Sequence, residues 1–304
     1  MNPEPFFSVV IPTYNRGHMI LKTLDSVFSQ TYSRYEIIVV DDCSTDETAA
    51  ILEPHIRASR IRFIKHDRNS ERAAARNTGM EKASGDFLTF LDSDDFMYSN
   101  NLADAAEFVR THPQTKFFHN LYHLVDPDKR VIFEYDFPAL TDRWRAITNG
   151  NFLSCVGVFI HREIYSRYRF DVNPILTASE DWEFWIRVLA DYEVGRVDKI
   201  NTAVVHHAGR SIKHLDFEQL RQRMAYIVEK VRNDPHLNSV YRSYLTRLEI
   251  GSLIYMSTVA NASRDHAAAL RCLLSAAAKN FRVAASLNFA KSLRVAIFQI
   301  DKGF

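Results

Sequence analysis

Short apolar runs alternate with amphipathic segments through about the first hundred residues, and this alternation limits the possible folds more than any other feature. Short β-branched runs are typical of buried parallel strands, and apolar residues at four-residue steps are typical of helices packed on a sheet. We expect strands at residues 7–11, 35–40, 61–64 and 87–91, and helices at 16–30, 44–57 and 72–83. Ser44 and Glu47 have the spacing of a capping box at the start of the second helix. The pattern predicts an α/β fold with a Rossmann-like, mostly parallel sheet and flanking helices.

Polar residues follow three of the four predicted strands. They are Pro12-Thr13-Tyr14-Asn15-Arg16, Asp41-Asp42 and Asp92-Ser93-Asp94-Asp95. Ligands of open α/β sheets bind beyond the carboxyl ends of the strands, so a binding site is expected where these clusters meet. Asp92 and Asp94 are spaced to share one Mg²⁺ or Mn²⁺, cations that bind carboxylates together with substrate phosphates. The alternative is that these acidic residues only line turns or lead into helices, where Asp is common.

Spacing and composition exclude several common classes of protein. None of the nine glycines has the partners needed for GxGxxG, GxxxxGK or GxSxG, and His119 and His123 enclose Asn120 where a zinc protease has Glu. Lys and Arg number 38 against 37 Asp and Glu, a balance that argues against nucleic-acid binding over the whole surface. The three cysteines are far apart, which fits a reducing cytoplasm. We expect neither a signal peptide nor a membrane-spanning segment.

The pattern changes after residue 110. A hairpin is expected from strands at 117–123 and 130–135, followed by a strand at 155–160 and a helix that begins at Glu180 after Ser179. From residue 212 onward helical periodicity replaces the strands, with helices expected at 215–232, 239–260, 267–279 and 282–299. We therefore divide the chain into a catalytic domain, residues 1–212, and a helical C-terminal extension, residues 213–304.

Five segments stand in a fixed order along the first hundred residues. They read FSVVIPTYNR at 7–16, SVFSQTY at 26–32, EIIVVDDCSTDET at 36–48, ARNTG at 75–79 and FLDSDD at 90–95. In order and spacing they resemble the family 2 glycosyltransferases, closely over residues 6–98 and more loosely to about 212. The resemblance implies the type A nucleotide-sugar fold and an inverting transfer. Cys43 departs from the family pattern, which usually has Gly or Asn there.

The resemblance implies a nucleotide-sugar donor, expected to be a UDP-sugar, and assigns residues to it. Pro12, Thr13 and Tyr14 would line the uracil pocket, with Tyr14 against the base. Asp42, together with Asp41, would bind the uracil or the ribose.

The remaining donor-side residues lie in three of the motifs. Arg16, Arg76 and Ser93 are expected to contact the nucleotide sugar. Asp92 to Asp94 would be the DxD motif, in which Asp94 binds Mn²⁺ or Mg²⁺ directly and Asp92, a second candidate ligand, lies nearer the ribose.

Glu180 and Asp181 match the acceptor-side motif of the family, in which the Asp is usually the base. An inverting transfer needs a carboxylate that takes the proton of the attacking hydroxyl. We expect Asp181 to do so and Glu180 to orient or bind the acceptor. The alternative is that both carboxylates only complement the dipole at the start of a helix. Trp182 and Trp185 can stack on a sugar or pack in the core.

A histidine near the end of a later strand often completes the metal site in this family. His206 and His207 compete for the role, and their spacing to Gly209 and Ser211 favours His207. The family pattern of Tyr-Arg upstream is absent, because Val204 and Val205 stand there. A packed or surface histidine is the alternative.

Residues 270–304 hold six basic residues against one acidic residue. A basic amphipathic end can lie on an anionic membrane surface, or it can be the solvated face of a helical bundle. The family often uses lipid-linked acceptors, so we expect a cytoplasmic protein with peripheral membrane contact through this segment.

The expected function is metal-dependent, inverting transfer of a hexosyl or N-acetylhexosaminyl group to a hydroxyl of a glycan or lipid-linked glycan, in cell-surface polysaccharide or glycoconjugate synthesis. Two alternatives stay open. A sugar-phosphate nucleotidyltransferase shares the sheet and metal but usually has a Gly-rich N-terminal loop, which this chain lacks. A catalytically silent nucleotide-sugar-binding scaffold would keep the fold without turnover.

Overall fold

The computed structural model describes residues 4–135, 137–207 and 216–298, and the chain separates into two compact units. The first comprises Met1–Leu140 and Leu153–Arg210, and the second comprises Thr141–Phe152 and Ser211–Phe304. This division places Thr141–Phe152 with the C-terminal helices, whereas the division expected at residue 212 places them with the catalytic domain.

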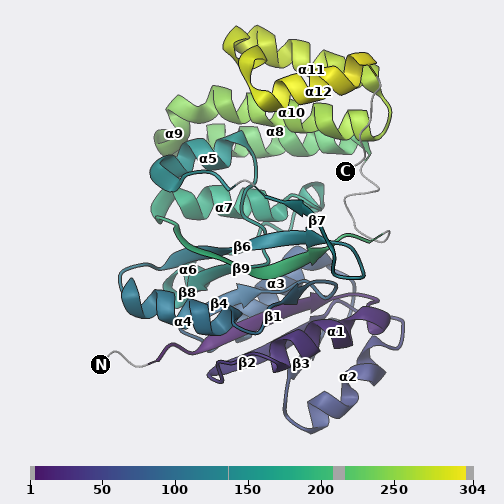
Figure 1. The fold of residues 1–304 in the computed structure, drawn as a ribbon, viewed down its shortest axis with the longest axis vertical. Coiled ribbons are helices and arrows are strands. Elements are labelled where there is room, and N and C mark those ends of the chain that lie inside the picture. The colour runs from purple at the N-terminus through teal and green to yellow at the C-terminus, as the bar shows by residue number, and fades with distance from the viewer. Residues whose placement is uncertain (1–3, 136, 208–215, 299–304) are drawn as a thin grey trace. The chain divides into compact units, whose positions relative to one another are not determined.

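A mixed sheet forms the centre of the first unit (Figure 1). Its strands are β1 (Phe7–Thr13), β2 (Tyr35–Asp41), β3 (Arg62–Lys65), β4 (Phe87–Phe90), β5 (Phe96–Met97), β6 (Phe117–Val125), β7 (Val131–Glu134), β8 (Val158–His161) and β9 (Gly195–Val205). The order is β3-β2-β1-β4-β8-β6-β9-β5, and β7 pairs with β6 as the expected hairpin. The first four strands are parallel, whereas β8 runs antiparallel to both of its neighbours. The expected α/β class is confirmed, and the mixed half begins at β8.

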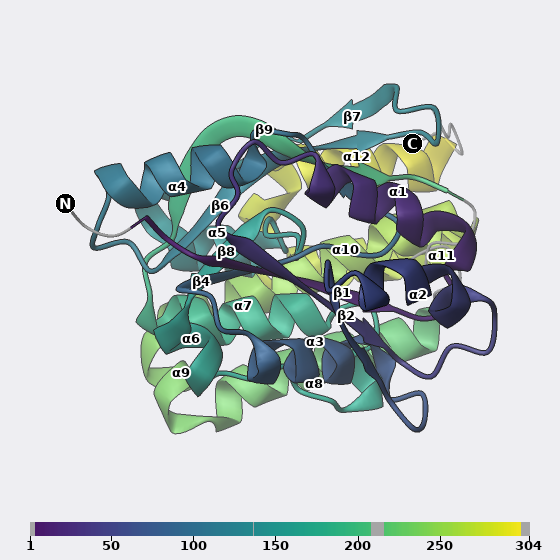
Figure 2. The ribbon, with the colours of Figure 1, turned by 90° about the horizontal axis from the view of Figure 1, so that it is seen from below.

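Helices cover both faces of this sheet. They are α1 (Gly17–Phe28), α2 (Thr48–Arg57), α3 (Glu71–Lys82), α4 (Asn101–Thr111), α6 (Arg162–Arg167) and α7 (Glu180–Asp191). Figure 2 shows α1 and α2 on one side of β1 and β2 and α3 on the other. Because side chains alternate along a strand, Val9 packs in the core cluster that includes Ile20 and Leu24 of α1, and Val10 faces α3. A Cβ on Gly79 of α3 would lie 2.2 Å from Val10 Cγ1, so the glycine of the ARNTG motif permits this close approach.

Strand β1 continues through Pro12, beyond the end expected from the sequence. β4 pairs with β1 only as far as Val10, and the amide of Leu91 donates to the Val10 carbonyl. In a parallel strand the backbone groups of Val10 and Pro12 point toward the same neighbour. A backbone N–H at position 12 would therefore point past the last residue of β1 that pairs with β4. Because Pro12 lacks this N–H, no hydrogen bond between β1 and β4 is lost.

The capping box expected at Ser44 is wrong. Helix α2 begins at Thr48 after Glu47, whose side chain makes no capping hydrogen bond, and Asp46 Oδ1 accepts from the Thr48 amide at 3.0 Å. The Ser44 hydroxyl instead accepts a hydrogen bond from the Asn15 amide at 2.8 Å. Asn15, which has a positive φ of 51°, thus joins the loop after β1 to the loop after β2.

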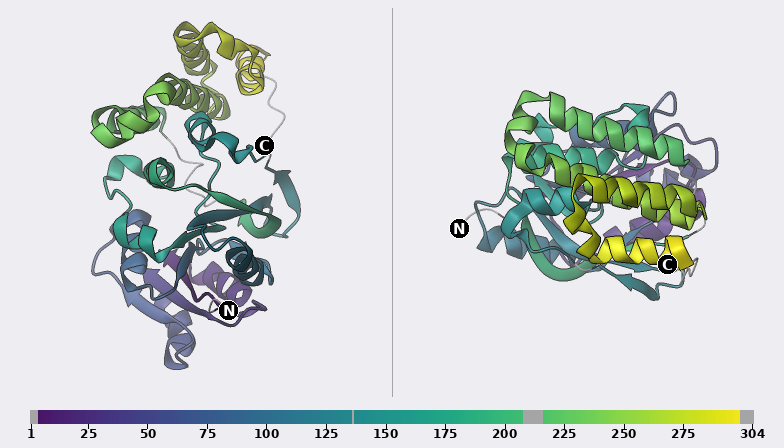
Figure 3. Two further views of the ribbon diagram at one scale, coloured as in Figure 1. Left: turned by 90° about the vertical axis from the view of Figure 1, so that its left-hand side faces the viewer. Right: turned by 90° about the horizontal axis from the view of Figure 1, so that it is seen from above.

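Helices form the second unit, in which α10 (Leu245–Ala262) packs against four others. These are α5 (Arg143–Asn149), α8 (Phe217–Asn233), α11 (His266–Lys279) and α12 (Leu287–Phe298). The helix expected at 239–260 is two helices, since α9 (Pro235–Tyr241) ends before a 3-10 turn and α10 follows. Figure 3 shows the green-to-yellow C-terminal helices side by side. Among the helices in the described ranges, none combines the length and apolar character needed to cross a bilayer.

Candidate active site

Two buried oxygens lie unsatisfied where β1 and β2 end. Thr13 and Asp41 are register partners on these strands and are almost completely buried. Asp41 Oδ1 accepts from the Ser44 amide at 3.0 Å, and Asp41 Oδ2 lies 3.8 Å from Lys65 Nζ. Within the described ranges neither Asp41 Oδ2 nor Thr13 Oγ1 has a hydrogen-bond partner. Burying a polar atom without a partner costs free energy, so two such oxygens side by side indicate a site that a ligand's donors complete.

Asp42, the second residue of Asp41-Asp42, accepts hydrogen bonds from the loop that leads into α3. Its Oδ1 lies 2.8 Å from His66 Nδ1 and accepts from the Ser70 amide at 2.9 Å. His66 Nε2 in turn lies 2.9 Å from Thr78 Oγ1 on α3. Asp42 is thus buried at the expected edge, with its oxygens already engaged by the protein.

The loop after β1 is held by hydrogen bonds to the loop after β2. Asn15 Oδ1 accepts from the Thr45 amide at 2.9 Å, and the Gly17 amide donates to Asp46 Oδ2 at 3.1 Å. Pro12 is buried in β1, whereas Tyr14 exposes 44% of its surface and is available to stack on a base. Arg16 Nε lies 3.7 Å from Asp94 Oδ2, which connects this loop to the DxD motif.

Arg76 bridges the DxD motif and the start of α7. Its Nη2 donates to Asp92 Oδ1 at 2.8 Å and its Nη1 donates to Glu180 Oε1 at 2.7 Å. Arg72, one turn earlier on α3, brings Nε to 3.7 Å from the same Glu180 oxygen. Glu180 Oε2 is buried and has no hydrogen bond to a residue in the described ranges. The expected donor-side and acceptor-side motifs are therefore parts of one charge cluster.

Asp181, next to Glu180 in this cluster, has a clearly raised pKa. Burial, and after it the neighbouring Glu180 carboxylate, raise the pKa of Asp181 against the opposing Arg76 guanidinium, and the result is a pKa of about 6. Cys155 lies buried near the same groups, and burial raises the pKa of its thiol well above the ordinary range. A carboxylate that ionises near pH 6 is suited to accept a proton at neutral pH.

Asp94 and His207 meet at the end of β9. His207 Nε2 lies 2.9 Å from Asp94 Oδ2, whereas the His206 amide donates to the Val125 carbonyl and continues the strand pairing. Asp95, the last residue of the acidic cluster, accepts from the Val205 amide at 2.8 Å and is buried, which fixes this loop. Ser93 is also buried between its two acidic neighbours.

Within the described ranges, no group of three or more His, Cys, Asp and Glu side chains is arranged to hold a metal ion. Asp94 and His207 supply one oxygen and one nitrogen, and both are ligand types that Mn²⁺ accepts. They fit a site in which the protein gives two ligands and a diphosphate and water give the rest.

Sequence reasoning missed two contributors. Arg72 was detectable, because it lies four residues before Arg76 and therefore on the same helix face. His66 had no such signal, since its contact with Asp42 depends on the packing of the segment after β3. Trp182 and Trp185 are both buried, and Trp185 stacks on Phe117 at 5.5 Å between ring centroids, so they pack in the core.

The model of the family described as glycosyl transferase family 2 matches residues 8–168, more than half of the chain. The chain belongs to this family.

Curated relatives of the chain are also described as glycosyltransferases. A region of 232 residues is 27% identical to an uncharacterised glycosyltransferase of Rickettsia felis, covering 76% of this chain and 38% of that protein. The chain thus spans about two fifths of the length of that relative. The UDP-Glc:alpha-D-GlcNAc-diphosphoundecaprenol beta-1,3-glucosyltransferase WfgD of Escherichia coli is 27% identical over 74% of this chain and 87% of its own.

Solved structures show the same fold. Residues 1–349 of Staphylococcus aureus TarS, in complex with UDP-GlcNAc, match with a TM-score of 0.67 and 22% identity, over 98% of this chain and 93% of that one. The mannosyltransferase PcManGT of Pyrobaculum calidifontis, in complex with GDP-Man and Mn²⁺, matches with a TM-score of 0.63 and 17% identity, over 98% and 85%. These matches confirm the type A glycosyltransferase fold expected from the sequence.

Proposed function

We propose that this protein transfers a hexosyl or N-acetylhexosaminyl group from a UDP-sugar to a hydroxyl of a glycan, with inversion at the anomeric carbon. The observation that carries the proposal is the Arg76 bridge. It holds Asp92 of the DxD motif and Glu180, the neighbour of Asp181, on one guanidinium at 2.8 Å and 2.7 Å. A donor diphosphate and an acceptor hydroxyl bound at these two motifs would lie close together, as a single displacement requires.

The donor's nucleotide would bind where β1 and β2 end. Within the described ranges Asp41 Oδ2, which lies 3.8 Å from Lys65 Nζ, and Thr13 Oγ1 are buried acceptors without a hydrogen bond. The N–H of a uracil or a ribose hydroxyl can satisfy them. Tyr14 is exposed at the same edge and can stack on the base. TarS, whose fold matches, is described in complexes with UDP and UDP-GlcNAc, which supports the choice of UDP.

Asp94 and His207 would hold a divalent cation, Mn²⁺ or Mg²⁺. When bound, such a cation neutralises charge that develops on the departing diphosphate. Arg16, whose Nε lies 3.7 Å from Asp94 Oδ2, adds a fixed positive charge on the same side. The Mn²⁺ in the PcManGT complex supports this assignment.

Asp181 would act as the base. Its carboxylate accepts the acceptor hydroxyl's proton as the hydroxyl oxygen attacks the anomeric carbon, and the bond from that carbon to the diphosphate oxygen breaks. Its pKa of about 6 leaves it ionised yet basic at pH 7. Glu180, held by Arg76 and Arg72, would orient the acceptor through its second oxygen.

The acceptor class follows from the relatives. WfgD is described as acting on a diphosphoundecaprenol-linked sugar and TuaG of Bacillus subtilis as a putative teichuronic acid biosynthesis enzyme, so we propose a glycan or lipid-linked glycan of polysaccharide synthesis. Peripheral contact with a cytoplasmic membrane surface fits the second unit, which exposes Leu274, Phe281 and Ile297 among the basic residues of 270–298.

Thermal unfolding with UDP and Mn²⁺, compared with Mn²⁺ alone, ADP and GDP, tests the donor site. Selective stabilisation by UDP that is mostly lost in Asp94→Ala supports the proposal, because a ligand that binds only the folded state raises the melting temperature. Hydrolysis of UDP-sugars by the wild type but not by Asp181→Asn then distinguishes an enzyme from a silent binding protein. Stabilisation by no nucleotide would contradict the assigned donor site.

A further inference from the structure

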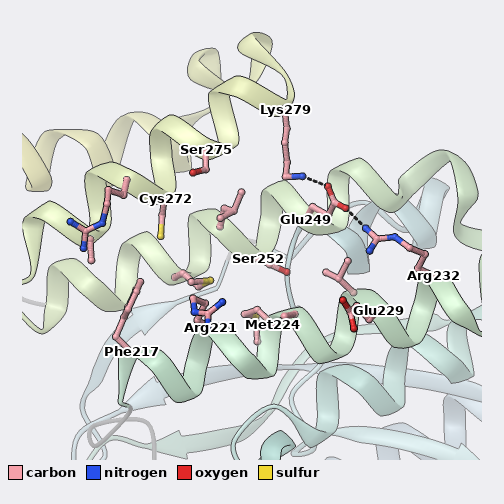
Figure 4. A pocket seen from close by; sticks show the side chains of 16 residues that line it. Phe217, Arg221, Met224, Glu229, Arg232, Glu249, Ser252, Cys272, Ser275 and Lys279 are labelled. Atoms are coloured by element: carbon pink, nitrogen blue, oxygen red, sulfur yellow. Dashed lines mark hydrogen bonds and ion pairs between the residues drawn. The ribbon is translucent and has the colours of Figure 1, made fainter.

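An elongated groove of about 400 Å³ lies within the helical unit, separate from the proposed donor site. Figure 4 shows that α8 forms one wall and α11 the other, with α10 between them. The residues on each wall repeat at three- and four-residue steps, as expected for one face of a helix. On α8 these steps place Phe217, Met224 and Val228 along the groove, and on α11 they place Ala268, Cys272 and Ser275.

The floor and walls are mainly apolar. Leu253 and Met256 of α10 line the groove together with Met224 and Val228 of α8, and Cys272 of α11 is a free thiol. Methionine side chains adapt to flexible apolar ligands because they are unbranched and rotate freely. Apolar surface of this kind gains free energy when a hydrocarbon covers it.

Basic side chains outnumber acidic ones along the rim. Arg221, Arg232, Arg271 and Lys279 line the groove, against Glu229 and Glu249. Glu249 pairs with both Arg232 and Lys279, as the dashed lines in Figure 4 show, and Arg221 pairs with Glu218. Arg271 forms no hydrogen bond or ion pair with a residue in the described ranges. One guanidinium is thus available at the edge of an apolar groove.

We propose that this groove binds a phosphate-headed, single-chain lipid, with the hydrocarbon chain between α8 and α11 and the phosphate at Arg271. A volume of about 400 Å³ has room for one hydrocarbon chain. A methylene group occupies about as much space as a water molecule, roughly 30 Å³ in the liquid. The groove therefore holds about thirteen methylene groups. The net positive rim selects an anionic head.

Calorimetric titration of the full chain with dodecyl phosphate, kept below its micelle concentration, tests the proposal. We expect saturable binding of one molecule, no binding of inorganic phosphate, and binding at least tenfold weaker for dodecyltrimethylammonium, which has the same chain and a positive head. Over a series from octyl to hexadecyl phosphate, each buried methylene should raise affinity about fourfold. The rise should stop near the length that fills the groove. Equal binding of both head groups, or no dependence on chain length, would overturn the proposal.

Two exposed positions allow the groove to be blocked from its walls without changing the core. Ala225→Trp on α8 and Ser275→Trp on α11 should each weaken dodecyl phosphate binding at least tenfold. Ala262→Trp is the matched control, because Ala262 is an exposed alanine of α10 that does not line the groove. Arg271→Glu should reverse the head-group preference, so that dodecyltrimethylammonium binds more tightly than dodecyl phosphate.

Alkylation of Cys272 locates the ligand. Dodecyl phosphate should slow the reaction of Cys272 with N-ethylmaleimide and leave that of Cys43 in the first unit unchanged, as measured by mass spectrometry of the peptides. Lys291→Glu, at an exposed position of α12 outside the groove, should weaken adhesion to anionic vesicles and leave dodecyl phosphate binding unaltered. An unprotected Cys272, or tryptophan variants that bind as the wild type does, would overturn the proposal whatever the transferase assays show.

Discussion

The loops after β1 and β2 and the first turn of α7 both border the candidate site, but their polar groups are stabilised differently. In the loops, neutral donors and backbone amides satisfy most acceptors, as in the bonds from the Thr45 amide to Asn15 and from Gly17 to Asp46. At α7, buried charges stabilise one another, with Arg76 between Asp92 and Glu180. The first arrangement depends little on charge, apart from the contacts of Asp41 with Lys65 and of Asp42 with His66, and the second depends on every member keeping its charge.

This difference suits the proposed roles of the two regions. A nucleotide is bound and released unchanged, so a rigid set of acceptors such as Thr13 Oγ1 and Asp41 Oδ2 is sufficient. Proton transfer is most efficient when the pKa of the base lies near the working pH, and burial and neighbouring charges can move a carboxylate's pKa toward it. Asp181 lies in that environment.

Arg76→Met should have the largest effect, because it removes the charge between two carboxylates. Breaking a buried pair costs about 3–5 kcal/mol, so we expect a comparable loss in the free energy of unfolding together with loss of transfer activity. Chemical denaturation measures the first. Arg57→Met is the matched control, since Arg57 pairs with Glu53 on the surface of α2 and should change stability by less than about 1 kcal/mol. Similar values for the two variants would show that the Arg76 bridge is not a stabilising element.

Asp181→Asn should separate catalysis from folding. Loss of the base should lower the transfer rate by about 10²–10⁴-fold while UDP still binds. The folded-state pKa of about 6 lies above the unfolded value of about 3.9, so ionisation of the wild type costs stability as pH rises from about 4 to about 6. The variant lacks this cost. Its melting temperature should exceed that of the wild type above pH 6, and the difference should vanish below pH 4.

The limit of that gain is about 3 kcal/mol, the free energy of a shift of about two pKa units. Melting curves of both proteins across pH 4–8 give the comparison. A constant difference across this range would contradict the assigned pKa, whereas an active Asp181→Asn would exclude Asp181 as the base and leave Glu180 as the candidate.

Asp94→Asn should abolish the response to Mn²⁺ with little change in fold, because Asp94 is partly exposed and its contacts are with Arg16 and His207. Loss of a metal ligand should lower transfer by about 10²-fold or more. His207→Gln should show a smaller loss that excess Mn²⁺ partly restores, as measured by activity over a series of Mn²⁺ concentrations. An Mn²⁺ response equal to that of the wild type in both variants would place the cation elsewhere.

The sequence predicted the parallel half of the sheet because apolar periodicity there is strong and local. Strands β1 to β4 and helices α1 to α3 lie within a few residues of their expected bounds. It could not predict the order of β8, β6, β9 and β5, since pairing between distant segments depends on packing that no local pattern records. The capping box at Ser44 failed for a related reason: a hydroxyl with the correct local spacing was bound by Asn15 of another loop.

The candidate site shows the same limit. Motif order identified Asp92, Asp94, Glu180 and Asp181 as candidates, and the structure places Asp92 and Glu180 on one arginine. The bridge itself joins residues 104 positions apart, and spacing carries no record of it. Arg76 was expected to contact the nucleotide, and that role stays a prediction. Its contacts in the structure are with Asp92 and Glu180.

Thr13→Val has the smallest expected effect, and it tests the region where β1 and β2 end. Valine has nearly the shape of threonine and lacks the buried hydroxyl, whose oxygen accepts no hydrogen bond from the described part of the chain. The variant should be as stable as the wild type or more stable by about 1 kcal/mol, because a buried group without a hydrogen bond costs about that much. Affinity for UDP should nevertheless fall about tenfold, the effect of one lost hydrogen bond.

Ser8→Ala is the control for this variant. The Ser8 hydroxyl is also buried in β1 but donates to Glu36 at 2.7 Å, so its removal should lower stability and leave UDP binding unchanged. If Thr13→Val instead lost stability and bound UDP normally, the hydroxyl would serve the fold, and the nucleotide would have to be recognised elsewhere on the edge of the sheet.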